Sequence, residues 1–139
     1  MRKPSVLIIE DNEQNLYLMR FLLEKNGFTV AAARDGQGGI RSACELLPDL
    51  ILLDIQLPLM DGYAVARELR GHSLLAKTPI IAVTSYAMAG DRERAMGAGA
   101  TDYIEKPINP DTFVEQVSTH RRPLQSPSGG EKNVDRTGC

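Results

Sequence analysis

The sequence is poor in cysteine and has no long apolar segment. Its two cysteines, Cys44 and Cys139, lie far apart, and Cys44 falls at helical spacing with Ile40, Ala43 and Leu47, so we expect it to pack as a small apolar side chain. No stretch approaches the roughly 18 apolar residues that a membrane span requires. The final residues, RTGC, place cysteine last, whereas a prenylation motif needs it earlier. These absences argue against a disulfide framework and a membrane anchor, and they predict a cytoplasmic protein.

Neither sign of charge dominates the sequence. Its 139 residues include 16 basic and 18 acidic side chains, which leaves a formal net charge of −2. General binding to nucleic acids or membranes is favoured by a clear excess of positive charge, so the composition suggests neither partner. The fractions of hydrophobic residues, 42%, and charged residues, 24%, are typical of a globular protein, and the length suits one domain. We therefore expect a single folded domain over residues 1–122.

The composition changes at Pro123. The segment PLQSPSGGEKNVDRTGC contains two prolines, two adjacent glycines and almost no apolar residues. Such a segment buries too little surface to offset the entropy of its chain. It predicts a disordered tail over residues 123–139, which is either a linker to a further domain or a natural or vector-derived end.

Short apolar runs alternate with helical patterns along the rest of the chain. Several runs are apolar without alternation, which indicates a parallel sheet with helices on both faces. The expected strands cover residues 5–9, 28–32, 50–53, 80–83 and 102–104. Five helices are expected. The first begins after Asn12, the second includes Ile40 to Leu47, and the third includes Val65 and Leu69. The fourth covers residues 89–98, and the fifth has Asn109 as its N-cap and Pro110 in its first turn. This order predicts an open, doubly wound α/β fold with a five-stranded parallel sheet.

The second expected helix contains two adjacent glycines, Gly38 and Gly39, near its start. Each glycine inside a helix costs about 0.5 to 1 kcal/mol relative to alanine. We therefore expect this helix to begin late or to fray.

Polar residues follow four of the five expected strands. Glu10 and Asp11 follow the first strand, Asp54 ends the third, Thr84 ends the fourth and Lys106 follows the fifth. In sheets of this class, ligands bind beyond the carboxyl ends of the strands, so we expect these residues to gather at one rim. Crowded carboxylates hold protons above their ordinary pKa unless a cation compensates them, and hard oxygen ligands favour Mg²⁺. A carboxylate beside Mg²⁺ can act as a nucleophile in phosphoryl transfer.

Each of these residues alone has an ordinary structural explanation. A single aspartate at a strand end is more often a helix cap or a turn former than a nucleophile, and Glu10 with Asp11 could simply start the first helix. Thr84 alone would be a common strand residue, and Lys106 alone a solvated one. The inference therefore depends on the whole constellation.

Four motifs then match a known family: IIEDN, DLILLDIQLPLMDG, IIAVTSYA and GATDYIEKPI. In their residues and their order along the chain, they closely resemble the receiver domains of bacterial two-component response regulators, which have a flavodoxin-like fold. The resemblance extends from Lys3 to about Arg122. Among receivers it is similar to single-domain cell-division regulators of the DivK type and to the receivers of hybrid histidine kinases.

The resemblance implies a phosphorylation site with Mg²⁺. Asp54 would accept a phosphoryl group from a histidine of a sensor kinase or a histidine phosphotransfer protein. Asp11 would bind Mg²⁺ directly, Glu10 would act on it mainly through water, and the main-chain carbonyl of Gln56 would complete the protein ligands. The only chemistry expected is self-catalysed phosphoryl transfer and autodephosphorylation, so the protein is expected to be a switch rather than an enzyme.

The resemblance also implies how the signal spreads. Lys106 and Thr84 would bind the phosphoryl oxygens, Tyr103 would swing inward after Thr84, and the bond between Lys106 and Pro107 would be cis, which proline makes accessible. A downstream protein would then bind the face around the fourth helix, the fifth strand and the fifth helix. No DNA-recognition motif follows the domain in this chain, so protein binding is the expected output.

Three alternatives differ from a stand-alone receiver. A receiver taken from a larger regulator or hybrid kinase shares every motif. A magnesium-dependent phosphohydrolase of the haloacid dehalogenase type would place its nucleophile after the first strand in a D-x-D pattern and add a substrate cap, whereas Asp54 follows the third strand. A flavin-binding module would need a phosphate-cradling loop after the first strand, where EDNEQN is acidic and lacks glycine.

Overall fold

The computed structural model describes residues 3–85 and 90–120 of the chain. Within these residues the chain forms five strands, five α-helices and one short 3₁₀-helix. The strands are β1 Ser5–Ile9, β2 Thr29–Ala33, β3 Leu50–Asp54, β4 Ile80–Thr84 and β5 Asp102–Glu105. The helices are α1 Glu13–Lys25, α2 Gly36–Leu46, α3 Gly62–Gly71, α4 Asp91–Gly97 and α5 Pro110–His120, with the 3₁₀-helix η1 at Ser73–Leu75. No described helix is both long and apolar enough to cross a bilayer.

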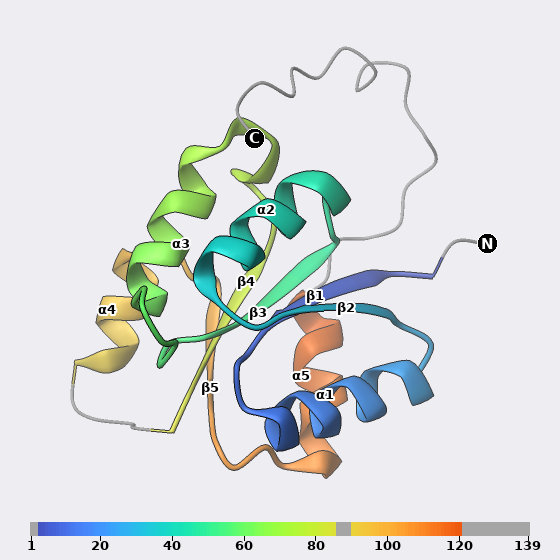
Figure 1. Cartoon of the computed structure of the whole chain (residues 1–139). Coiled ribbons are helices and arrows are strands. Elements are labelled where there is room, and N and C mark those ends of the chain that lie inside the picture. The colour runs from blue at the N-terminus through green and yellow to red at the C-terminus, as the bar shows by residue number, and fades with distance from the viewer. Residues whose placement is uncertain (1–2, 86–89, 121–139) are drawn as a thin grey trace.

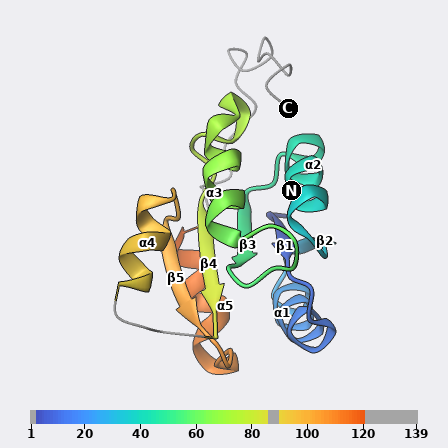
Figure 2. The ribbon, with the colours of Figure 1, turned by 60° about the vertical axis from the view of Figure 1, so that its left-hand side comes forward.

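The five strands form one parallel sheet in the order β2-β1-β3-β4-β5. This order is that of flavodoxin-like folds, and it confirms the predicted fold class. Helices α1 and α5 cover one face of the sheet, and α2, α3 and α4 cover the other (Figure 1). Figure 2 shows the five strands side by side across the view, from β5 through β4, β3 and β1 to β2.

The central strands are apolar throughout because both of their faces are buried. Along β1 and β3, alternate side chains point to opposite faces of the sheet. Leu7 and Leu53 belong to the core layer under α2, α3 and α4, whereas Ile8 and Leu52 belong to the layer under α1 and α5. The unbroken apolar runs of the sequence therefore reflect two separate core layers.

Several expected boundaries differ from the structure. Strands β3, β4 and β5 each end one residue later than predicted, at Asp54, Thr84 and Glu105. The second strand covers Thr29–Ala33, one residue later than predicted, and is paired with β1 over its whole length. The fourth helix begins at Asp91 and ends at Gly97, a narrower range than the predicted 89–98, and residue 89 lies outside the described residues. The predicted tail over 123–139 also lies outside them.

The predicted late start of the second helix is wrong. Helix α2 begins at Gly36, because the side chain of Asp35 caps it by accepting a hydrogen bond from the main-chain N–H of Gly38 at 2.7 Å. A Cβ atom at position 39 would lie 2.5 Å from Cδ1 of Ile9. The glycine therefore lets α2 pack closely on β1, and this tertiary contact outweighs the unfavourable helix propensity of Gly39.

Candidate functional site

The carboxyl ends of the strands carry the polar residues that the sequence analysis singled out. Glu10 comes directly after β1, Asp54 is the last residue of β3, and Thr84 is the last residue of β4. Because β1, β3 and β4 are parallel neighbours, these ends lie at the same rim of the sheet. Lys106 follows β5, and its main-chain N–H donates a hydrogen bond to the carbonyl of Thr84 at 2.7 Å.

Three carboxylates form a cluster at this rim, which we call the acid cluster: Glu10, Asp11 and Asp54. One carboxylate oxygen from each residue lies within 4.8 Å of the others. Glu10 and Asp54 are only 1% and 3% exposed, whereas Asp11 is exposed. Burying two carboxylates this close together is costly unless a cation compensates them.

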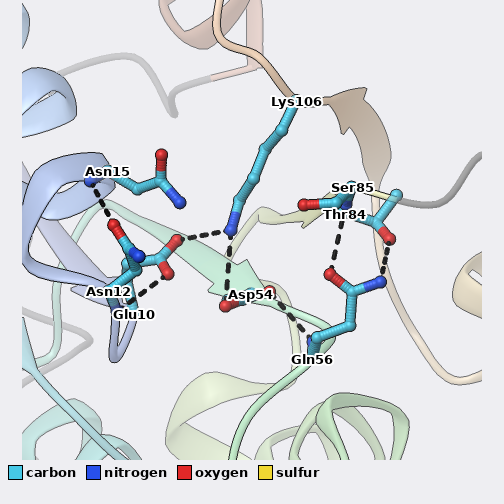
Figure 3. Close-up of polar contacts among 8 residues, drawn as sticks. All are labelled: Glu10, Asn12, Asn15, Asp54, Gln56, Thr84, Ser85 and Lys106. Atoms are coloured by element: carbon cyan, nitrogen blue, oxygen red, sulfur yellow. Dashed lines mark hydrogen bonds and ion pairs between the residues drawn. The ribbon is translucent and has the colours of Figure 1, made fainter.

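Lys106 supplies a positive charge to the acid cluster (Figure 3). Its Nζ lies 2.9 Å from Oε1 of Glu10 and 3.4 Å from Oδ2 of Asp54, and its side chain is 8% exposed. The peptide bond between Lys106 and Pro107 is cis, the geometry that the resemblance implied. One lysine against three carboxylates leaves the ionised cluster negative.

The loop after β1 orients Glu10. Asn12 is the N-cap of α1, and its side chain accepts a hydrogen bond from the main-chain N–H of Asn15 at 2.9 Å. The main-chain N–H of Asn12 donates to Oε2 of Glu10 at 3.2 Å. The capped start of α1 therefore holds the glutamate toward the rim (Figure 3).

The surroundings of Glu10 change its acidity. Burial raises its pKa from 4.5 to about 7; the bond to Lys106 lowers the pKa, and the neighbouring Asp54 raises it. A group with a pKa of about 7 exchanges its proton near neutral pH. The charge of the acid cluster therefore depends on pH and on any cation that binds there.

The acid cluster fits a hard divalent cation. Carboxylate and carbonyl oxygens are the ligands that Mg²⁺ takes in proteins, and it usually keeps several waters. Oε1 of Glu10 is buried, and among the described residues it has the ionic contact with Lys106 but no hydrogen bond of good geometry. A water bound to a cation could supply that hydrogen bond, and the exposed Asp11 leaves a route to solvent.

Gln56 has contacts that the sequence analysis did not anticipate. The resemblance implied a role only for its main-chain carbonyl, but its main-chain N–H donates to Oδ1 of Asp54 at 2.9 Å. Its side chain also reaches the end of β4, where Nε2 donates to Oγ1 of Thr84 at 3.0 Å (Figure 3). The only sequence signal was a polar residue two positions after Asp54, which gives no hint of a partner 28 residues away.

Tyr103 lies apart from the acid cluster, on the edge strand β5. It is aligned with Ala82 of β4, and its partly buried side chain packs against the core layer under α2, α3 and α4. Burial is the main cause that raises the pKa of its hydroxyl. Tyr103 also borders a cavity of about 270 Å³ that is lined by residues of α4, β5 and α5, among them Arg92, Phe113 and Gln116.

Comparisons with known proteins point to one family. Residues 6–118 match the response regulator receiver domain. The polar-differentiation response regulator DivK of Brucella anthropi is 43% identical over 116 residues, which are 84% of this chain and 94% of that protein. DivK of Brucella ovis shows the same identity and coverage.

Solved structures agree with this match. The receiver domain of a sensor histidine kinase from Pseudomonas aeruginosa, whose structure has a magnesium ion coordinated in the active-site cleft, is 35% identical with a TM-score of 0.79. The alignment covers 85% of this chain and 97% of that one. The chemotaxis response regulator CheY4 of Vibrio cholerae is 25% identical with a TM-score of 0.81 and coverages of 85% and 98%. Since the receiver match spans most of its length, this chain belongs to the response regulator receiver domain family of two-component signalling.

Proposed function

We propose that Asp54 is the phosphoacceptor of this receiver and that a phosphohistidine of a sensor kinase or phosphotransfer protein is the donor. Receivers interact with such proteins and with downstream effectors. The observation that carries the assignment is the position of Asp54. Asp54 is 3% exposed, is the last residue of the central strand β3 and belongs to the acid cluster beside Lys106.

The transfer would proceed by attack of a carboxylate oxygen on phosphorus. A new O–P bond forms on Asp54 while the N–P bond of the phosphohistidine breaks, and the bonding electron pair returns to the imidazole nitrogen. Burial of Asp54 at the end of a strand fixes the direction of the carboxylate. Its Oδ1 already accepts a hydrogen bond from the N–H of Gln56, and its Oδ2 faces Lys106.

The residues that would hold Mg²⁺ are the acid cluster and the main-chain carbonyl of Gln56. A bound magnesium ion would neutralise the charge on the transferring phosphoryl oxygens. Asp11 is the exposed member of the cluster and would be a direct ligand. Glu10 would accept hydrogen bonds from water in the cluster, because its buried oxygens face the rim.

Two side chains at the rim would bind the new phosphate. Phosphorylation adds about −1.5 to −2 charges and three strong acceptor oxygens. The Nζ of Lys106, which now pairs with Glu10 and Asp54, would turn to a phosphoryl oxygen. The hydroxyl of Thr84 would donate to another.

The output face would be formed by α4, β5 and α5. Movement of Thr84 toward Asp54 would change the packing beside β5, and Tyr103 would move inward. The cavity that Tyr103 borders lies on this face, so the motion would alter the surface offered to a downstream protein. This is a shift between two packings of the same fold.

Labelling with acetyl phosphate and Mg²⁺ tests the assignment. We expect the wild-type protein to gain the mass of one phosphoryl group and the Asp54→Asn variant to gain none. Asp35→Asn is a matched control, because Asp35 is exposed and asparagine caps a helix as well as aspartate does. Undiminished labelling of Asp54→Asn would refute the proposal.

A further inference from the structure

The side chain of Gln56 links the ends of two neighbouring strands. It projects from the residue two places after β3, and its amide faces the end of β4 (Figure 3). Nε2 donates a hydrogen bond to Oγ1 of Thr84 at 3.0 Å, and Oε1 accepts one from the main-chain N–H of Ser85 at 3.2 Å. The main-chain N–H of the same residue contacts Asp54. One glutamine therefore touches the proposed phosphoacceptor and two polar groups across the rim.

A phosphoryl group on Asp54 would compete with Oε1 of Gln56 for the N–H of Ser85, and it would require the Thr84 hydroxyl to turn away from Nε2 of Gln56. Its three oxygens need donors at the rim. The N–H of Ser85 already donates to Gln56, and one N–H cannot serve two acceptors at full strength. The hydroxyl oxygen of Thr84 points toward the glutamine amide and away from Asp54 (Figure 3).

We propose that the side chain of Gln56 is a positioning residue that holds Thr84 and Ser85 in the unphosphorylated arrangement. We call its amide and the two hydrogen bonds it makes with these residues the Gln56 latch. Phosphorylation releases the latch, because the N–H of Ser85 then donates to a phosphoryl oxygen instead of Oε1, and the Thr84 hydroxyl turns away from Nε2 to donate to another. This inference rests on the proposed function, since it requires Asp54 to be the phosphoacceptor.

A cavity beside Gln56 could hold its side chain after the latch is released. A cavity of about 320 Å³ borders the latch, and Gln56 and Thr84 are both part of its wall. Asp91 and Arg94 line the same cavity, and the guanidinium of Arg94 lies over the ring of Tyr63. An amide that turned into this cavity would meet the polar side chains of Asp91 and Arg94. The latch is therefore able to open without unfolding the strand ends.

Removing the latch should favour the phosphorylated arrangement. A neutral hydrogen bond within a protein changes an equilibrium by a factor of roughly 2 to 10. Two such bonds stabilise only the resting state, so their loss lowers the cost of switching. We expect the Gln56→Met variant to bind beryllofluoride, a mimic of the phosphoryl group, roughly tenfold more tightly than the wild type.

The test measures beryllofluoride binding in the presence of Mg²⁺ by calorimetry. Methionine has a similar size but cannot make either hydrogen bond, and the main-chain carbonyl of residue 56 remains. Gln37→Met is the control, because Gln37 is an exposed glutamine on α2, and its affinity should equal that of the wild type. Gln56→Ala serves as a second variant if the methionine variant does not fold. Equal or weaker binding by the folded Gln56 variants would overturn the latch.

Two further measurements separate a latch from a merely structural contact. In the amide NMR spectrum, the Ser85 resonance of Gln56→Met should shift toward its beryllofluoride-bound position before any ligand is added. In a Thr84→Val background the gain from Gln56→Met should shrink, because one of the two hydrogen bonds is already absent. A gain of the same size in both backgrounds, with an unchanged Ser85 resonance, would contradict the latch. Absence of binding by the wild-type protein would instead refute the proposed function.

Discussion

Glu10 is a residue whose charge state depends on the fold. In an unfolded chain its carboxyl titrates near 4.5, whereas burial in the folded protein raises its pKa to about 7. Lys106 counteracts this increase, and Asp54 adds to it. Between these two pH values the folded protein keeps a proton that the unfolded chain releases. The stability of the protein is therefore linked to pH through this residue.

The sign of this linkage gives a prediction. Where the folded state binds more protons, the free energy of unfolding decreases as the pH rises. In the absence of divalent cations, we expect Glu10 to destabilise the fold progressively from about pH 4.5 to about pH 7, with no further change above that range. Urea unfolding in EDTA across this range measures the effect.

The Glu10→Gln variant isolates the contribution of Glu10, because its amide does not titrate. As the pH rises from about 4.5 to about 7, the unfolding free energy of the wild type should decrease relative to that of this variant. Mg²⁺ should oppose this trend, because a nearby cation favours the carboxylate. A difference that does not depend on pH would show that Glu10 keeps an ordinary pKa.

At the scale of secondary-structure elements, α2 shows a packing constraint that its own sequence does not reveal. Gly36 and Gly39 lie on the buried side of the helix. A Cβ atom at position 36 would lie 2.7 Å from Cγ2 of Val65, and one at position 39 would lie 2.5 Å from Cδ1 of Ile9. These distances are too short for real contacts, so the two glycines set how closely α2 approaches α3 and β1.

We expect the Gly39→Ala substitution to destabilise the protein by about 1 to 3 kcal/mol, although alanine is the better helix former. Ile9 is fully buried, and because protein interiors are closely packed we expect it to have little room to move. The matched control is Gly97→Ala at the end of α4, where a Cβ atom would meet nothing within 4 Å. Denaturant unfolding of both variants compares them; a stabilised Gly39→Ala protein would contradict the packing argument.

At the scale of the whole molecule, the folded unit consists of one sheet between two core layers. Among the described residues, the buried hydrophobic side chains begin at Val6 and end at Val117. The family match covers a similar range, residues 6–118. Both observations support our proposal that residues 1–122 form the folding unit.

A truncation series tests this proposal. We expect a chain that ends at residue 122 to unfold at the same urea concentration as the full chain, because no buried hydrophobic side chain of the described residues is removed. A chain that ends at residue 109 should be severely destabilised, since it loses the fully buried Phe113 and Val117 of α5. A lower urea midpoint for the chain that ends at residue 122 would show that the 17 residues it lacks, 123–139, contribute to the folded core.

Much of this architecture could be predicted because its signals are local. Unbroken apolar runs indicate buried parallel strands, and alternating helical patterns indicate the layers that cover them. The positions of Glu10, Asp11, Asp54, Thr84 and Lys106 after these strands follow from the same pattern. The carboxyl ends of parallel strands lie at the same edge of a sheet. Once the strands are known to be parallel neighbours, these residues are therefore expected to lie close together.

The sequence by itself determined the fold class and the set of residues at the rim, since periodicity and strand-end positions can be read along the chain. Only the tertiary structure decided the close packing of α2 on β1, the raised pKa of Glu10 and the reach of Gln56 to Thr84. Each of these depends on atoms far apart in the chain: Ile9 against Gly39, Asp54 against Glu10, and Thr84 of β4 against Gln56, two residues after β3. Desolvation, close packing and hydrogen-bond geometry act through space, and local sequence patterns do not record them.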